Sequence, residues 1–165
     1  MSGKRRSYET GHRPKFLVVV DETPECERAL RFAARRVTRT GASLLLLGVV
    51  APPDNFEWLG VGDAMRAEAE EEAGERLEAA SSAARSAAGV EPEQVVRVGD
   101  KSEAILELIN ADEDISFLVL AAGTGSEGPG PLVSNLVGKA AGTFPVPVVI
   151  VPGGLTDEEI DALAG

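Results

Sequence analysis

The stretch FLVLAAGTGSEGPGPLVSNLVGKAAG, residues 117–142, contains three pieces that predict three kinds of structure. The apolar run at 116–122 does not alternate with polar residues, which is typical of a strand buried on both faces of a sheet. A glycine-rich loop follows, and Pro131 suits the first position of a helix, which we expect over 131–141. A strand, a loop and a helix in this order form the repeating unit of a parallel α/β fold.

The same unit recurs along the whole chain. Apolar, β-branched runs predict four further strands, at 15–20, 43–50, 94–98 and 146–151. Between them we expect a helix capped by Thr23 with Pro24 at its first position, a long helix within 62–88, and a helix opened by a capping box of Asp100 and Glu103. Right-handed crossovers place the carboxyl ends of all strands at one edge of the sheet, where α/β proteins bind their ligands.

Three segments fall outside these units. We expect residues 1–14 to be a disordered basic tail and residues 153–165 to be a C-terminal tail with a short surface helix, capped by Thr156 and Glu159. The insertion at 51–66 carries Trp58 and other apolar residues, and is either a lid over a ligand or a flap packed on the body or a partner. Within the first expected helix, arginines at 28, 31, 35 and 39 form a basic stripe, which is typical of a solvated face.

Length and charge limit the function further. With 165 residues the chain should form one domain, and no apolar run approaches the roughly 18 residues that span a membrane. The net charge is −11, and from Gly41 onward the chain has 22 acidic and 6 basic residues. Because so acidic a body repels the phosphate backbone, we expect no nucleic-acid partner. One cysteine, Cys26, excludes an internal disulfide framework and favours a cytoplasmic location.

The glycine loop imitates two phosphate-binding motifs without fitting either. Gly123, Gly125 and Gly128 spell G-x-G-x-x-G, but a dinucleotide fold places that triplet after its first strand, with an acidic residue about 20 positions on. The Gly138-Lys139 pair lacks the earlier glycine and the following Ser or Thr of a P-loop. The acidic pair Asp21-Glu22 also resembles that of a receiver domain, but this interpretation is disfavoured, because no lysine follows the last strand.

A different spacing does fit a known family. Gly125-x-x-Gly128, nine residues and then Gly138 resemble the G-x-x-G-x9-G-[ST] signature of the universal stress protein family. The resemblance covers 15–152, where FLVVVDETPECERAL, LLLLGVV, VGDKSEAILELI and FPVPVVIVP follow the family's order. It implies a universal stress protein domain: an α/β three-layer sandwich with a five-stranded parallel sheet in the order 3-2-1-4-5 and helices on both faces, as in adenine-nucleotide alpha-hydrolases. It also implies a homodimer through the last strand.

The resemblance also assigns residues to a nucleotide site. It implies that Asp21 meets the nucleoside, that Val49 offers backbone to adenine, and that the glycine motif holds phosphates of ATP or AMP, possibly with Mg²⁺. The motif's residues are Gly123, Gly125, Ser126, Gly128, Gly138 and Lys139. Consecutive amides at 123–128 could form an anion-binding nest, which Glu127 in the same loop would oppose unless a divalent ion bridged it to phosphate.

Alternatives remain for each of these residues. The glycines could form only a tight turn, as in family members without a ligand; Asp21 could cap the first helix, and Lys139, which replaces the family's Ser or Thr, could be solvated. We expect a cytoplasmic nucleotide-binding stress-response module with at most slow ATP hydrolysis, because no nucleophile–base pair or metal cluster is evident. The alternative is a dimeric interaction protein of the same fold without nucleotide.

Overall fold

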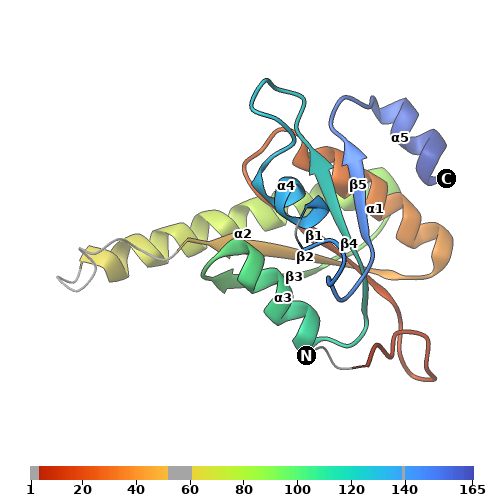
Figure 1. The fold of residues 1–165 in the computed structure, drawn as a ribbon, viewed down its shortest axis with the longest axis horizontal. Coiled ribbons are helices and arrows are strands. Elements are labelled where there is room, and N and C mark those ends of the chain that lie inside the picture. Colours follow the sequence, from red (N-terminus) through yellow and green to blue (C-terminus); the bar gives the residue numbers. More distant parts are fainter. Residues whose placement is uncertain (1–3, 52–60, 139) are drawn as a thin grey trace.

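The computed structural model describes residues 4–51, 61–138 and 140–165. Five strands form one parallel sheet in the order β3-β2-β1-β4-β5, which confirms the strand order that the resemblance implies. The strands are β1 (Lys15–Val19), β2 (Ser43–Val50), β3 (Glu93–Val98), β4 (Ile115–Ala122) and β5 (Val148–Pro152). The helices are α1 (Cys26–Thr40), α2 (Val61–Ala88), α3 (Lys101–Ala111), α4 (Pro131–Val137) and α5 (Asp157–Ala164) (Figure 1).

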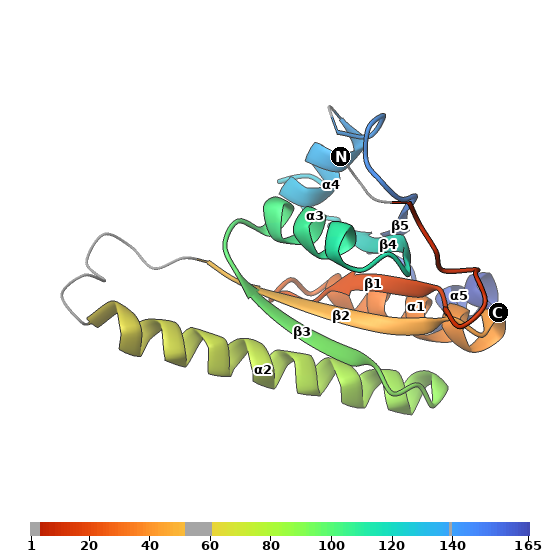
Figure 2. The same ribbon diagram turned by 90° about the horizontal axis from the view of Figure 1, so that it is seen from below.

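Helices cover both faces of the sheet because its strands are apolar on both faces. In β1, Val18 packs in one core layer with α1 and α2, whereas Leu17 packs in the other with α3 and α4. Both side chains are fully buried. Figure 2 shows the sheet edge-on between the two helical layers. The strand order reverses between β1 and β4, so a crevice is expected at their carboxyl ends.

The start of α1 differs from the prediction. Its N-cap is Glu25, without a side-chain cap hydrogen bond, and not Thr23. The Thr23 amide and hydroxyl both donate to Asp21 Oδ1, so the hydroxyl is engaged in the preceding turn. In α3 the Asp100 side chain caps the Glu103 amide as expected. Helix α4 is shorter than expected: it ends at Val137, with Gly138 as its C-cap, rather than at 141.

Helix α2 extends well beyond the sheet (Figure 2). Only its later turns pack on the body, through Ala73, Leu77, Ala80 and Ala84. Residues 63–68 are exposed, so this part of the insertion expected as a lid or flap is a helical extension. The rest of that expectation, at 52–60, lies outside the described residues. No helix in the described parts of the chain has the length and apolar character needed to cross a membrane.

Helix α5 is part of the body, in contrast to the surface tail that we expected. Ile160 and Ala164 are fully buried. The arginine stripe predicted as a solvated face binds this helix: Arg28 lies 2.6 Å from Asp157, and Arg31 and Arg35 lie 2.7 and 3.2 Å from Asp161. The sequence contains a signal for this contact that the prediction missed. Acidic side chains recur on α5 at a spacing that matches the spacing of the arginines on α1.

The basic N-terminal segment also differs from the disordered tail that we expected. Over 4–14, the Arg5 guanidinium donates to the carbonyls of Ile109 and Asp112, at 2.8 and 3.0 Å. Ser7 is buried and contacts Ser116, and His12 lies 2.6 Å from Asp114. This segment therefore packs at the amino ends of the strands, opposite the edge where the ligand was expected.

Candidate functional site

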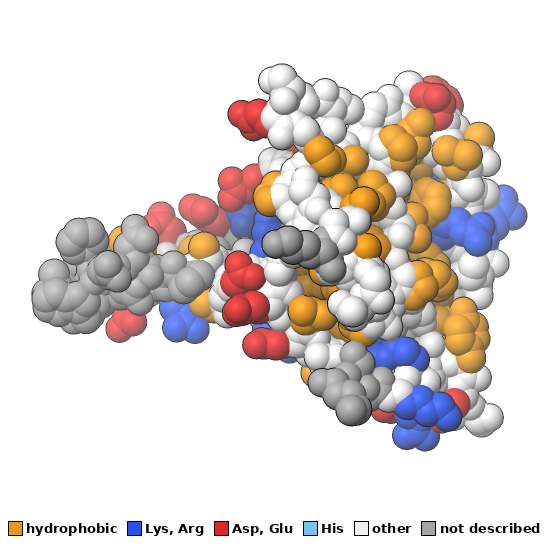
Figure 3. Space-filling view, in the orientation of Figure 1, with side chains coloured by type: hydrophobic (Ala, Val, Ile, Leu, Met, Phe, Trp, Pro, Cys, Tyr) orange, Lys and Arg blue, Asp and Glu red, His pale blue; other side chains and the backbone are white. Residues whose placement is uncertain are grey.

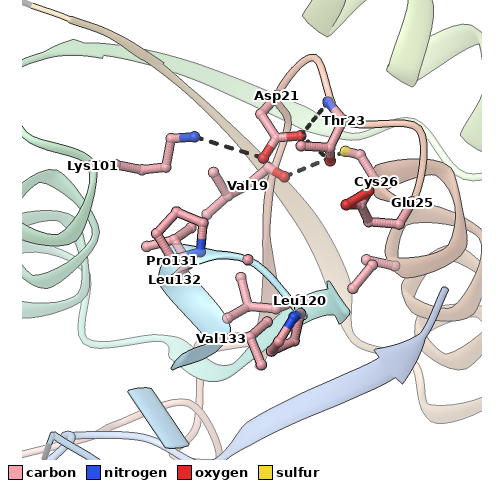
Figure 4. Close-up of a pocket in the computed structure, with 14 residues that line it drawn as sticks. Val19, Asp21, Thr23, Glu25, Cys26, Lys101, Leu120, Pro131, Leu132 and Val133 are labelled. Atoms are coloured by element: carbon pink, nitrogen blue, oxygen red, sulfur yellow. Dashed lines mark hydrogen bonds and ion pairs between the residues drawn. The ribbon is translucent and has the colours of Figure 1, made fainter. Parts of the chain in front are cut away.

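The candidate site is a crevice at the carboxyl ends of β1 and β4, where the strand order reverses. A cavity of about 120 Å³ lies there, between the loop after β1 and the start of α4. Apolar side chains such as Leu120 and Val133 line it together with Asp21, Glu25 and Lys101 (Figure 4). Apolar walls with a few convergent polar groups are typical of small-molecule sites.

Asp21 follows β1 and points into this cavity (Figure 4). Its Oδ1 accepts hydrogen bonds from the amide and hydroxyl of Thr23, at 2.9 and 2.6 Å. Its Oδ2 lies 3.7 Å from Lys101 Nζ, which is an ion pair longer than a hydrogen bond. Asp21 thus holds the turn before α1 but does not cap the helix, whose N-cap is Glu25, and it keeps one oxygen weakly paired toward the cavity.

The glycine loop after β4 is partly closed on itself. The Gly123 amide donates to the Pro129 carbonyl at 3.0 Å, and the Gly128 amide donates to Gly125 at 3.1 Å. Gly128 has φ +92°, a left-handed conformation that favours glycine. Within the described residues, the four amides of 124–127 have no protein acceptor and lie on an exposed segment. Those four amides, rather than all six of 123–128, are therefore not engaged within the loop.

A carboxylate lies against this loop. Glu25 Oε1 is 3.0 Å from the position that a Cβ on Gly123 would occupy, so the carboxylate lies close against the Gly123 backbone. Among the described residues, the Glu25 carboxylate has no ion-pair or hydrogen-bond partner. It lines both the cavity and the neighbouring groove. A negative charge at this point opposes the binding of a phosphate by the loop amides.

Two open pockets adjoin the cavity. A groove of about 650 Å³ lies between the glycine loop and the start of α1, where Arg28 is held by Asp157. A second pocket, of about 560 Å³, lies at the ends of β2 and β3 and includes Val49, Arg76 and Lys101. Lys101 lines this pocket and the cavity, so the two spaces meet at its side chain.

The residues predicted for the nucleotide site therefore fall into separate groups. Asp21 lines the cavity, and Val49 lies in the pocket beside it. The loop residues line the groove: Gly123, Gly125, Ser126 and Gly128. Gly138 ends α4, where a Cβ would lie only 2.9 Å from the Ser134 carbonyl oxygen, so its evident role is to terminate the helix. Lys139 lies outside the described residues.

Sequence reasoning missed two charged side chains of this site, Glu25 and Lys101. Glu25 is one of several acidic residues around 21–27, and no local pattern distinguishes it. Lys101 follows the Gly-Asp turn after β3, and the parallel sheet brings that turn to the same edge as Asp21. The position of Lys101 directly after a strand's carboxyl end is the signal that could have identified it.

The site contains little that could carry out covalent or metal chemistry. Burial raises the pKa of the Cys26 thiol to about 11, so the thiol is protonated and unreactive at neutral pH. Its Sγ lies 3.5 Å from the Val19 carbonyl oxygen. Over the described parts of the chain, no group of three or more His, Cys, Asp or Glu side chains is placed to hold a metal ion. The arrangement can bind a ligand and orient it.

The sheet order places the protein in the class of doubly wound α/β proteins, and its crevice lies at the switch point, where proteins of this class bind their ligands. Within that class, the family model described as "Universal stress protein family" matches residues 12–152. The chain belongs to the universal stress protein family. Helix α5 lies beyond the matched region.

Solved structures share this fold at low identity. Universal stress protein UspA from Lactobacillus plantarum is 19% identical, with a TM-score of 0.68, over 84% of this chain and 97% of that one. A universal stress protein in complex with cAMP is 19% identical, with a TM-score of 0.58, over 86% and 98%. The Archaeoglobus fulgidus protein in complex with dAMP is 19% identical, with a TM-score of 0.56, over 84% and 96%. No curated protein sequence matches this chain significantly.

Proposed function

We propose that this protein binds an adenine nucleotide, ATP or AMP, at the crevice between β1 and β4 and acts as a dimeric stress-response module. The observation that carries this proposal is the coincidence of three features at one edge: a cavity at the switch point, the carboxylate of Asp21, and the loop amides of 124–127, which have no acceptor among the described residues. Each meets a different part of a nucleotide. The complexes of two relatives with cAMP and dAMP support the same ligand class.

The proposed pose extends over two spaces. A cavity of about 120 Å³ is small beside the roughly 300–1,000 Å³ of typical ligand sites, so the nucleotide must also occupy the pocket of about 560 Å³. In this pose adenine lies near the backbone of Val49. A ribose hydroxyl donates to Asp21 Oδ2, because Oδ1 is already engaged by Thr23. The phosphates lie toward the amides of 124–127.

We propose binding rather than efficient turnover. The protein's single histidine, His12, pairs with Asp114 at the far edge, and the Cys26 thiol is protonated. Slow ATP hydrolysis would depend on positioning and on Mg²⁺ that enters with the nucleotide, held by its phosphates. Lys139 as a further phosphate ligand stays a hypothesis from the sequence. The cytoplasm is the compartment that we propose.

We also propose that two copies associate through the edge formed by 146–151. Strand β5 pairs only with β4 within the described sheet, and Val148, Val149 and Ile150 are half-buried. Hydrophobic side chains gather on the face that includes α4 and β5 (Figure 3). An exposed apolar edge strand favours pairing with another chain. Ile150→Lys should shift the dimer toward monomer in analytical ultracentrifugation, whereas Leu106→Lys on α3 should not; equal dimer stability would contradict this edge as the interface.

The test of nucleotide binding begins with the purified protein. Denaturation should release an adenine nucleotide that mass spectrometry identifies, and the emptied protein should bind AMP or ATP with Mg²⁺ in isothermal titration calorimetry. Asp21→Asn should weaken this binding about tenfold, since the neutral amide is a poorer acceptor for a ribose hydroxyl. Absence of released nucleotide together with absence of heat and of thermal stabilisation would overturn the proposal.

One observation favours a second candidate function, a dimeric interaction protein without nucleotide. The amides of Gly123 and Gly128 already bind carbonyls of their own loop, and Glu25 lies against Gly123. In this candidate the glycine loop is only a tight turn. The same calorimetry separates the two, because an interaction protein would dimerise with no response to AMP or ATP.

A further inference from the structure

Lys101 occupies a distinctive position at the ligand edge. It is the first residue of α3, and its side chain lines both the cavity that holds Asp21 and the pocket that holds Val49. A nucleotide that occupies both spaces must therefore pass beside Lys101. Figure 4 shows the lysine reaching from α3 across the cavity toward Asp21. The pair is weak, since Nζ lies 3.7 Å from Oδ2 and the Lys101 side chain is 39% exposed.

The charges around this position require a cation. Asp21 and Glu25 line the cavity, and further carboxylates line the adjoining pocket. Among the described residues that line the cavity, Lys101 is the only lysine or arginine. The other basic side chains nearby are engaged, with Arg76 lying 3.5 Å from Glu22 and Arg28 lying 2.6 Å from Asp157. Without Lys101, the net negative charge of the lining would oppose an anionic ligand.

We propose that Lys101 is a phosphate-contacting residue of the nucleotide site and that it exchanges its ion pair with Asp21 for the ligand's phosphate. The exchange frees Asp21 Oδ2 to accept a hydrogen bond from a ribose hydroxyl. The same movement of the Lys101 side chain therefore allows both its contact with the phosphate and the contact of Asp21 with the ribose. Lys101 thereby makes the site select adenosine phosphates over adenosine. This inference rests on the proposed function, since it assigns the phosphate contact within the same site.

The test compares AMP with adenosine, which lacks the phosphate. Isothermal titration calorimetry would measure both dissociation constants for the wild-type protein and for Lys101→Met, Lys101→Arg and the control Arg66→Met. Arg66 lies on the exposed part of α2, away from the cavity, and its replacement gives the same change in net charge. Circular dichroism melts would verify that each variant is folded.

We expect Lys101→Met to weaken AMP binding at least tenfold, to leave adenosine binding within threefold, and to reduce the dependence of AMP affinity on NaCl concentration. Lys101→Arg should retain AMP affinity within about threefold, since the charge remains. Unchanged AMP affinity in Lys101→Met, or an equal loss for AMP and adenosine, would overturn the assignment. If the wild-type protein binds neither compound, the proposed function fails, and the inference fails with it. If both compounds bind and Lys101→Met leaves the affinity for AMP unchanged, only the inference fails.

Discussion

The Asp161 carboxylate of α5 accepts two hydrogen bonds from the Arg31 guanidinium of α1, at 2.7 and 2.8 Å. Two parallel N–H···O bonds fix both the distance and the orientation of the partners. The hydrogen bonds from Arg31 hold the pKa of the Asp161 carboxyl below its usual value. The contact joins the last helix to the helix whose first turn lines the candidate site.

The first prediction concerns pH. Because the pKa of Asp161 is lower in the folded state, its charge stabilises the fold fully above the unfolded value of about 3.9. This contribution is lost as the pH falls through the folded pKa. Asp161→Asn should therefore lower Tm at pH 7, and the difference from wild type should shrink below about pH 4. Thermal melts from pH 7 to pH 2 measure this, with Glu107→Gln on α3 as a control, since Glu107 is exposed and has no ion pair within the part of the chain that the structure describes. A difference that persists at the lowest pH would contradict the role of the charge.

The second prediction tests whether α5 belongs to the core. Ile160 is fully buried in the layer formed with α1, so Ile160→Ala should cost about 2–4 kcal/mol through lost burial and a residual cavity. Leu163 lies on the same helix but is 65% exposed, and Leu163→Ala should change stability by about 0.5 kcal/mol or less. Urea denaturation gives both values. Similar small effects for the two variants would mean that α5 detaches in solution.

The third prediction concerns the carboxylate beside the glycine loop. Glu25→Gln removes a negative charge next to Gly123 and should tighten AMP binding about three- to tenfold, or about 0.7–1.4 kcal/mol. Glu27→Gln, on the exposed side of the same helix, changes the net charge equally. Calorimetry at low and high NaCl concentrations separates a local effect from a general one. Equal gains in both variants would show that only the net charge matters.

The fourth prediction uses Cys26 as a reporter of the cavity. Burial raises its pKa to about 11, so the thiolate is scarce at pH 7.5 and alkylation by iodoacetamide should be slow in the native protein. Unfolding in urea restores an ordinary thiol and should accelerate the reaction at least tenfold. Because Cys26 lines the cavity, AMP should slow native alkylation further. Intact-mass spectrometry over time gives the rates, and rapid native alkylation would contradict the burial of this thiol.

Most of the sheet could be predicted because its signals are local. Uninterrupted apolar runs marked β2 at the observed bounds and the other strands within two residues. The caps of α3 and α5 were also evident, since Asp100 and Thr156 bind amides three residues ahead. Thr23 was assigned wrongly as a cap because Asp21 competes for its hydroxyl, and both outcomes fit the same short sequence.

The site was predictable only in outline. Parallel topology places Asp21, Val49 and the loop at one edge, but their distribution over three adjoining spaces depends on how side chains pack. The approach of Glu25 to Gly123 joins segments about 100 residues apart, and no local window contains both.

The amino-acid sequence by itself determined the alternation of strands and helices, the strand order through the family resemblance, and the edge where a ligand would bind. These follow from periodicity and turn chemistry, which act over a few residues. Only the tertiary structure decided which charges meet, as in the pairs of Arg31 with Asp161 and of Lys101 with Asp21. Electrostatic energy depends on distance through space, and folding sets that distance between residues 130 and 80 positions apart.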